Sequence, residues 1–567
     1  MSGPSMPLPV AEQPDPTGLR ADMRALIILA LPIIGTKVSH FALGLTDFIV
    51  VSRLGTEATA AISPSTFFLF IILCLGMGLS NAVQTFAAQS LGRGKPAEGA
   101  AYAWQTFYIG AAFTALVPLI NSALPTFWGA VGHAPAVQEM EIAYCRIVMW
   151  SIGPAILCTG LESFFNGVHH PKVAMHSVLV AVVLNIFADI GLVFGKFGLP
   201  RLGIEGAAWA TLISWLVRAA MLTGIFLSRE YHRQFASRSG WRFDWSCQRG
   251  ILNLGAPASI QWTLDVASWF VFLAWLMAGF DTATLAATNI AMQYMHVSFM
   301  PAIGVGIAVS TLVGNAIGEK RLDLAMRRVR ACMWITGAYM GVVGIGFWVF
   351  NESLMRILSS DAAVIAVGAG ILIWAAVFQV FDAACITYTC ALRGAGDAKW
   401  PAVVVILNCW ILFIGGGWLA TKLLPGWLHH GPWMTCTLYI IFLGVLMYGR
   451  WQGGKWRKID IFAHQRESDA KAIEPRSSEI EPRASGNEPC VSGNEPRASG
   501  NEPCVSGNEP RASGNEPCVS GNEPRASGDE PCVSGNEPRA SARAADQTGL
   551  NDALANPAPR GLKPAAP

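Results

Sequence analysis

Charged residues are scarce in this 567-residue chain. Asp, Glu, Lys and Arg together make up 14% of it, whereas a soluble globular protein has about 25%. Hydrophobic residues make up 52%, and the mean hydropathy is +0.41. Because so much apolar surface cannot be hidden beneath a charged exterior, the composition excludes an ordinary soluble domain and predicts an integral membrane protein. No basic stretch interleaved with aromatic residues suggests nucleic acid as a partner.

Sequence signatures of catalysis and of cofactor binding are also missing. The chain contains no HExxH, no phosphate-binding glycine loop, no Ser-His-Asp context and no paired metal-ligand spacing. We therefore expect neither an enzyme nor a bound cofactor, a coupling ion excepted. The segment before Leu26 lacks the charged and apolar regions of a signal peptide, so residues 1–25 are interpreted as a short cytoplasmic tail.

Long apolar runs are abundant, and about twelve of them can span a bilayer. The predicted fold class is therefore an all-α membrane protein. The runs lie near residues 26–50, 60–86, 101–124, 143–165, 173–195 and 204–228, and then near 251–277, 284–313, 332–350, 364–391, 400–420 and 432–449.

The two sets of six runs resemble each other. Residues 76–92 (GMGLSNAVQTFAAQSLG) and 304–318 (GVGIAVSTLVGNAIG) place Gln89 against Asn315 and Gly92 against Gly318. Halves that begin and end on the same side are related by an axis along the membrane normal. The sequence thus predicts two pseudo-symmetric six-helix bundles, 26–228 and 251–450, joined by a cytoplasmic connector loop at 229–250.

Lys and Arg are concentrated in alternate connecting segments, above all in the 228–249 loop. By the positive-inside rule, this loop and both termini are expected in the cytoplasm. The absence of a targeting segment favours the inner membrane of a bacterium. The opposite segments hold only Arg53, Lys196, Arg201, Arg356 and Lys422.

Several motifs occur in order along residues 25–450. They are Leu54-Gly55-Thr56 with Ala58 to Ala61, Gln84-Thr85, Gln89-x-x-Gly92, its echo Asn315-x-x-Gly318, and ALRGAGD at 391–397. Together they resemble the multidrug and toxic compound extrusion (MATE) transporters. The resemblance implies a two-lobed, twelve-helix antiporter that exports organic molecules, often cationic and amphipathic, in exchange for protons or sodium ions.

Acidic and amide side chains within the N-terminal runs are candidates for ion coupling. Asp47 stands where the family has a first-helix aspartate implicated in coupling, although pairing with Arg53 near the helix end is the alternative. Asn185 and Asp189 are four residues apart and share one helix face. They resemble the pair that faces the first-helix acid in part of the family. Thr211 is a secondary candidate.

These groups suit two kinds of coupling ion. Two carboxylates in an apolar cavity favour a proton on one of them. Their oxygens, with the amide carbonyl of Asn185, would equally suit a sodium ion at Asp47, Asn185 and Asp189. No other metal site is expected.

The C-terminal half contains two further candidate acids. Asp382 resembles the family's tenth-helix acid, whereas Asp265 stands where sodium-coupled members typically have a glutamate, which leaves the coupling ion open. Gln84 and Gln293 are secondary candidates, and Lys37 and His40 receive no assigned role. The alternative for Asp265 and Asp382 is a buried ion pair with Arg146, Arg218 or Lys37.

The last hundred residues differ completely in character. Residues 483–541 repeat a fourteen-residue unit, RASGNEPCVSGNEP, which has too few apolar side chains to bury a core. We therefore expect residues 451–567 to form a disordered cytoplasmic tail.

The combined prediction is a monomeric secondary antiporter that works by alternating access. Its partners would be small organic substrates and the lipid bilayer. The alternative is a lipid-linked saccharide flippase of the same superfamily, a class that tends to line its cavity with basic residues. The sequence discloses neither the natural substrate nor the coupling ion.

Overall fold

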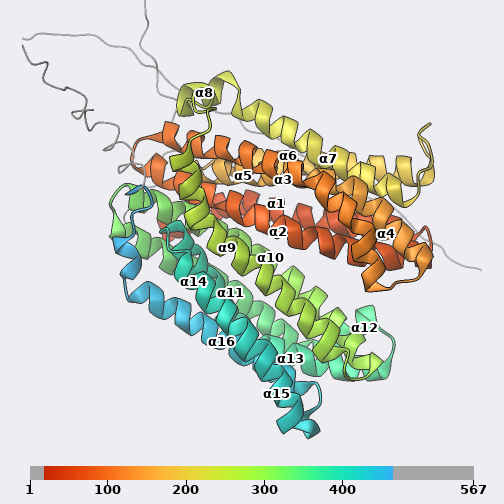
Figure 1. The fold of residues 1–567 in the computed structure, drawn as a ribbon. Coiled ribbons are helices and arrows are strands. Elements are labelled where there is room, and N and C mark those ends of the chain that lie inside the picture. The colour runs from red at the N-terminus through yellow and green to blue at the C-terminus, as the bar shows by residue number, and fades with distance from the viewer. Residues whose placement is uncertain (1–17, 464–567) are drawn as a thin grey trace, which may run out of the picture. The chain divides into compact units, whose positions relative to one another are not determined.

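The computed structural model describes residues 18–463, and all regular structure in that range is helical. Twelve helical segments of this part of the chain are long and apolar enough to cross a membrane, which confirms the predicted fold class (Figure 1). The repeat at 483–541 lies outside the described residues.

The N-terminal half comprises six spans, the fourth of which is α4 and α5 joined by the short turn η1 (Met149–Ser151). The helices are α1 (Leu19–Ser52), α2 (Thr56–Gly92), α3 (Pro96–Val131), α4 (Pro135–Val148), α5 (Ile152–Gly167), α6 (Pro171–Phe194) and α7 (Ile204–Phe226).

The C-terminal half has the same number of spans, two of which contain π-helical segments, η2 (Phe272–Met277) and η3 (Asn408–Gly415). Short helices α8 (Arg229–Phe235) and α12 (Asn351–Leu358) lie in connections. The long helices are α9 (Trp245–Val271), α10 (Thr282–Gly318), α11 (Leu322–Val349), α13 (Ala362–Gly394), α14 (Lys399–Leu407) with α15 (Gly416–Leu423), and α16 (His430–Gln452).

Local sequence signals explain where several helices begin and end. Pro96, Pro135 and Pro171 occupy first-turn positions of α3, α4 and α6, where the missing N–H costs nothing. Gly132 and Gly195 end α3 and α6 in the left-handed conformation that glycine adopts without strain. These boundaries follow from the sequence alone.

Three predicted boundaries need correction. α1 begins at Leu19 instead of near residue 26, because Asp22 is buried and accepts a hydrogen bond from Arg327 Nε at 3.0 Å. The predicted connector loop at 229–250 contains α8 and the first turns of α9, which starts at Trp245. The tail predicted to begin at 451 is helical to Gln452 and packed beyond it.

The segment that follows α16 packs against both halves. Phe462 is 3% exposed, lies beneath the guanidinium of Arg93, and makes edge contacts with Phe86 and Tyr102 of the N-terminal half. Ile461 lies against Gly396 of the C-terminal half. These apolar side chains explain why the ordered part of the chain extends past the predicted boundary.

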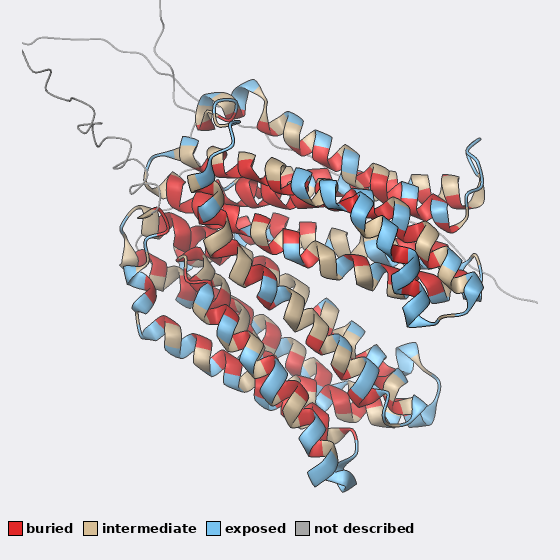
Figure 2. Ribbon diagram, in the orientation of Figure 1, coloured by how far each residue is buried: buried red, intermediate tan, exposed pale blue. Residues whose placement is uncertain are grey.

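The halves meet through α1 and α2 of the N-terminal half and α9 and α10 of the C-terminal half. α2 and α10 touch at the end of the bundle that carries α8, which we call the connector end (Figure 1). Every residue from 82 to 90 on α2 and from 308 to 316 on α10 is buried, as the red ribbon of Figure 2 shows. A helix that is buried on all sides is surrounded by protein. These two stretches therefore form the centre of the molecule at its connector end.

Hydrogen bonds across this contact confirm the predicted repeat of the two halves. Thr85 Oγ1 donates to the carbonyl oxygen of Arg393 at 3.0 Å. Its counterpart Thr311 donates to the carbonyl oxygen of Asn166 at 3.2 Å. Asn166 and Arg393 stand just before the paired Gly167 and Gly394, so each bond is the two-fold image of the other. The two halves are thus related by a pseudo-two-fold axis through their contact.

Glycine permits the closest approach at the connector end. A Cβ atom on Gly92 would lie 2.1 Å from the carbonyl oxygen of Asn315, and one on Gly318 would lie 2.4 Å from that of Gln89. Gln89 and Asn315 are themselves counterparts, so the contact is symmetric. Backbone cannot yield as a flexible side chain can, and both positions therefore require glycine.

A buried ion network joins α1, α5 and α7 within the N-terminal half. Glu162 accepts from Lys37 Nζ and from Arg218 Nη2, each at 2.8 Å. Arg218 Nη1 lies 2.7 Å from Nε2 of His40, whose ring stacks on Trp215. The carboxylate thus compensates two cations at a depth where unpaired charge is costly.

Substitution of Gly92 tests the close contact between the halves. We expect Gly92→Ala to lower the melting temperature, because forcing extra atoms into a packed contact costs about 1–3 kcal/mol. Gly224→Ala is the matched control, since this glycine of α7 has open space where its Cβ would be. That change should leave stability unchanged or raise it. Equal melting temperatures for the two variants in detergent would contradict the proposed contact.

Substitution of Glu162 tests the ion network. We expect Glu162→Gln to destabilise the protein by about 3–5 kcal/mol, because the buried Arg218 and the half-buried Lys37 would lose their shared partner. Glu352→Gln is the control. It removes an exposed pair with Arg356 on α12, worth about 1 kcal/mol at most. Thermal unfolding of both purified variants provides the comparison, and an unchanged transition for Glu162→Gln would contradict a stabilising role for the network.

Candidate functional site

Four of the predicted site residues come together inside the N-terminal half. Asp47 of α1 accepts a hydrogen bond from Thr211 Oγ1 of α7 at 3.0 Å. The Asp47 carboxyl also interacts with Asn185 and Asp189, both on α6. All four side chains are buried, and Asn185 and Asp189 are fully inaccessible to solvent. We call Asp47, Asn185, Asp189 and Thr211 the N-terminal acid cluster.

Most polar atoms of this cluster have no hydrogen-bond partner within the described residues. Asp47 Oδ1, both carboxyl oxygens of Asp189 and both amide atoms of Asn185 are buried and unpartnered. The oxygens among them cost free energy unless a hydrogen-bond donor, a proton or a cation satisfies them. The arrangement can therefore bind a small positive charge, although it is assembled from three different helices.

The alternative partner for Asp47 is not used. Arg53 is exposed at the end of α1, whereas Asp47 is 8% exposed and faces α6 and α7. One further group was missed in the sequence: Tyr144 of α4 is buried and interacts electrostatically with both Asp47 and Asp189. A lone tyrosine in an apolar run carries no spacing signal that would have identified it.

The C-terminal half brings its two predicted acids near each other. Asp265 lies on α9 and Asp382 on α13; both are half-buried and interact electrostatically. Asp265 Oδ1 accepts a hydrogen bond from the hydroxyl of Tyr439 on α16 at 3.2 Å. Tyr439 also stacks on Phe413. Sequence reasoning missed Tyr439, because nothing in its own helix marks it.

The predicted alternative pairings of these acids do not occur among the described residues. Lys37 and Arg218 pair with Glu162, and Arg146 is exposed. Sequence reasoning missed Glu162, although a carboxylate within the apolar run ILCTGLESFF was a sufficient signal for an intramembrane site. Once Glu162 has taken these cations, neither Asp265 nor Asp382 has Lys37 or Arg218 for a partner.

The secondary candidates Gln84 and Gln293 lie elsewhere. Gln84 Nε2 donates to the carbonyl oxygen of Ile307 at 2.8 Å and to Thr311 Oγ1 at 3.0 Å, so it belongs to the contact between the halves. Gln293 is exposed on α10. The structure brings neither of them into the N-terminal acid cluster.

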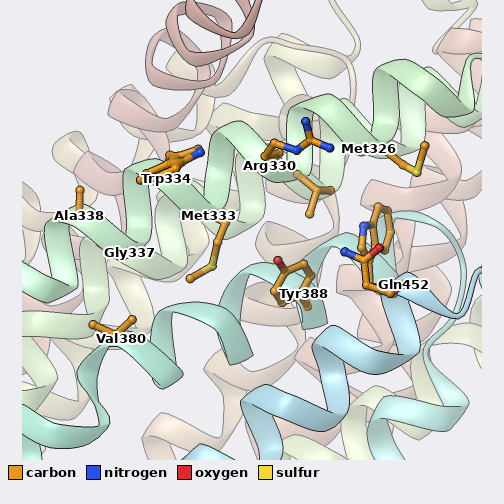
Figure 3. A pocket seen from close by; sticks show the side chains of 11 residues that line it. Met326, Arg330, Met333, Trp334, Gly337, Ala338, Val380, Tyr388 and Gln452 are labelled. Atoms are coloured by element: carbon orange, nitrogen blue, oxygen red, sulfur yellow. The ribbon is translucent and has the colours of Figure 1, made fainter.

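Two hollows bear on the question of where a ligand could bind. A small one of about 40 Å³ lies where the halves meet and is lined by Asn81 and Thr85 from one half and by Trp262 and Arg393 from the other. A larger one of about 500 Å³ lies between α11, α13 and α16 (Figure 3). None of the predicted site acids lines it.

Bacterial multidrug resistance proteins are similar to this chain in sequence. A probable multidrug resistance protein NorM of Rhizobium meliloti (strain 1021) is 30% identical over 394 residues, covering 68% of this chain and 84% of that protein. A probable multidrug resistance protein NorM of Thermotoga maritima is 28% identical over 453 residues, covering 78% of this chain and 95% of its own.

Solved structures share the fold. An outward-facing multidrug resistance MATE family transporter of the MOP superfamily is 18% identical with a TM-score of 0.69, over 77% of this chain and 97% of that one. A MATE structure in complex with MaL6 is 17% identical with a TM-score of 0.71, over 77% and 98%.

The match to a family model follows the internal repeat. The MatE family model matches residues 32–190 and residues 260–419, which are equivalent stretches of the two halves. The resemblance inferred from the motifs is thereby confirmed, and the chain belongs to the MatE family.

Proposed function

We propose that the chain is a secondary antiporter that exports organic cationic or amphipathic compounds in exchange for protons or sodium ions. Relatives over most of its length are named as multidrug resistance proteins, which supports a transporter and not an enzyme. The observation that carries the proposal is the N-terminal acid cluster, in which Asp47 Oδ1 and both carboxyl oxygens of Asp189 are buried and lack hydrogen-bond partners within the described residues. Those carboxylates would bind the coupling ion.

The basic residues at the connector end and the hydrogen bonds between the two halves support a mechanism of alternating access. The connector end is rich in Lys and Arg and would face the cytoplasm, in a bacterial inner membrane. The hydrogen bonds between the halves lie toward that end, so the conformation described here is closed to the cytoplasm. An ion that enters from outside would neutralise Asp47 and Asp189 and favour substrate release on the outer side.

The energy for this cycle would come from the ion. Inward movement of one positive charge down about 100 mV supplies roughly 2.3 kcal/mol. A carboxylate that releases its ion toward the cytoplasm would recover its charge, and that charge would favour rebinding of a cationic substrate. The flippase alternative finds no support in the names of the relatives.

Neutral substitutions of the acids test this mechanism. We expect Asp47→Asn and Asp189→Asn each to reduce drug efflux roughly tenfold or more, since coupling energies of about 1–3 kcal/mol correspond to factors of 5–150. Asp382→Asn should also reduce efflux. Asp361→Asn is the control: Asp361 is exposed and caps α13, a role that Asn fulfils equally well. Wild-type efflux in all three acid variants would rule the mechanism out.

The identity of the coupling ion can be tested in liposomes without ATP. A pH gradient and a sodium gradient are imposed separately. We expect one of them to drive transport of a fluorescent cation by the purified protein, and the gradient that does so identifies the coupling ion. The Asp47→Asn variant should respond to neither. If neither gradient drives the wild-type protein, the chain is not an antiporter of protons or sodium ions.

A further inference from the structure

The 500 Å³ groove lies away from both acid pairs and has no role in the proposed cycle (Figure 3). Its walls come from α11, α13 and the end of α16, all within the C-terminal half. The volume falls within the range of about 300–1,000 Å³ that is typical of ligand sites. The groove is therefore large enough to bind a ligand, and the molecules that surround these membrane-spanning helices are lipids.

One end of the groove is apolar. Met333, Trp334 and Val380 line it together with Gly337 and Ala338, and Trp334 is 62% exposed. Figure 3 shows these side chains along α11 and α13, on the side of the groove away from Gln452. Methionine side chains adapt to irregular apolar ligands. An acyl chain suits such a wall, because it has no polar group to satisfy.

The other end carries positive charge that has no counter-ion among residues 18–463. Arg330 lines the groove, is exposed, and forms no ion pair or hydrogen bond with residues 18–463. Arg457 follows α16 in η5 (Lys455–Lys458) and places Nη2 3.1 Å from the sulfur of Met326, which also lines the groove. Two guanidinium groups thus lie at the same end, near Gln452.

The depth of Arg330 explains what this charge would meet. Arg330 is eight residues into α11, about 12 Å from the connector end of that helix at a rise of 1.5 Å per residue. A 28-residue helix is about 42 Å long. A centred hydrocarbon core of about 30 Å therefore begins about 6 Å from the helix end and places the Cα atom of Arg330 about 6 Å inside it. An arginine there extends toward the interface, where lipid phosphates are the available anions.

We propose that the groove binds one anionic glycerophospholipid from the leaflet at the connector end. Its phosphate is held by Arg330 and Arg457, and one of its acyl chains lies along Met333, Trp334 and Val380. The lipid fills a hollow between α11, α13 and α16 that protein side chains leave open. The site is independent of the acid cluster and of the direction of transport.

Lipid binding to the purified full-length protein tests this proposal. We expect native mass spectrometry to show one tightly retained phosphatidylglycerol and a preference over phosphatidylcholine. Arg330→Gln combined with Arg457→Gln should reduce that preference roughly thirtyfold, since two basic groups near the surface contribute about 1 kcal/mol each and about 1.4 kcal/mol corresponds to a factor of ten. Arg356→Gln is the matched control, because this exposed arginine lies on α12 at the opposite end of α11.

A second variant addresses the apolar end of the groove. Ala338 is exposed in the groove, so Ala338→Trp would fill it without entering the protein core. This variant should lose the retained lipid while keeping the wild-type melting temperature and the charged end. Retention of phosphatidylglycerol by Ala338→Trp would show that the acyl chain lies elsewhere and would overturn the proposal.

Three further outcomes would also overturn it. Equal retention of phosphatidylcholine would remove the role of the guanidinium groups. Displacement of the lipid by inorganic phosphate alone would indicate a simple anion site. Competition by a fluorescent cationic dye that is unaffected by Arg330→Gln would indicate that the groove binds transported compounds instead.

Discussion

The approach of α2 to α10 at two glycines determines how the rest of the structure is arranged. At Gly92 and Gly318 each helix touches the backbone of the other, with no room for a Cβ atom on either side. Because the two residues are counterparts in a repeat, one local contact imposes a two-fold relation on both halves. The buried stretches 82–90 and 308–316 extend this contact along the axis.

Within that frame the chain treats its buried charges in two different ways. Glu162 forms ion pairs with Lys37 and Arg218, and these pairs connect α1, α5 and α7. Asp47 and Asp189 have no such cation, although they lie in the same half. A carboxylate with a fixed counter-ion has no need of a mobile one. In the N-terminal half, Asp47 and Asp189 are therefore the candidates for binding a mobile ion, because no cation pairs with them among the described residues.

The two halves are symmetric in backbone and asymmetric in chemistry. The N-terminal acid cluster is fully buried between α1, α6 and α7, whereas Asp265 and Asp382 are half-buried and Asp265 is bonded to Tyr439. The ion network around Glu162 likewise belongs to one half. The duplicated fold thus repeats the glycine contact at Gly92 and Gly318. Each half nevertheless carries its own set of polar groups.

Hydropathy, motif order and helix spacing are properties of short stretches, and they were enough to predict the membrane class, the twelve spans and the internal repeat. The family resemblance added Asp47, Asn185, Asp189 and Thr211 as candidate residues. Which groups meet was visible in the folded molecule alone. Lys37 and Arg218 form ion pairs with Glu162. Tyr144 and Tyr439 lie beside acids on other helices. Phe462 packs against the bundle beyond the predicted boundary. The physical reason is that partners on different helices depend on the rotation and tilt of each helix in the bundle, and no period within a single helix records those angles.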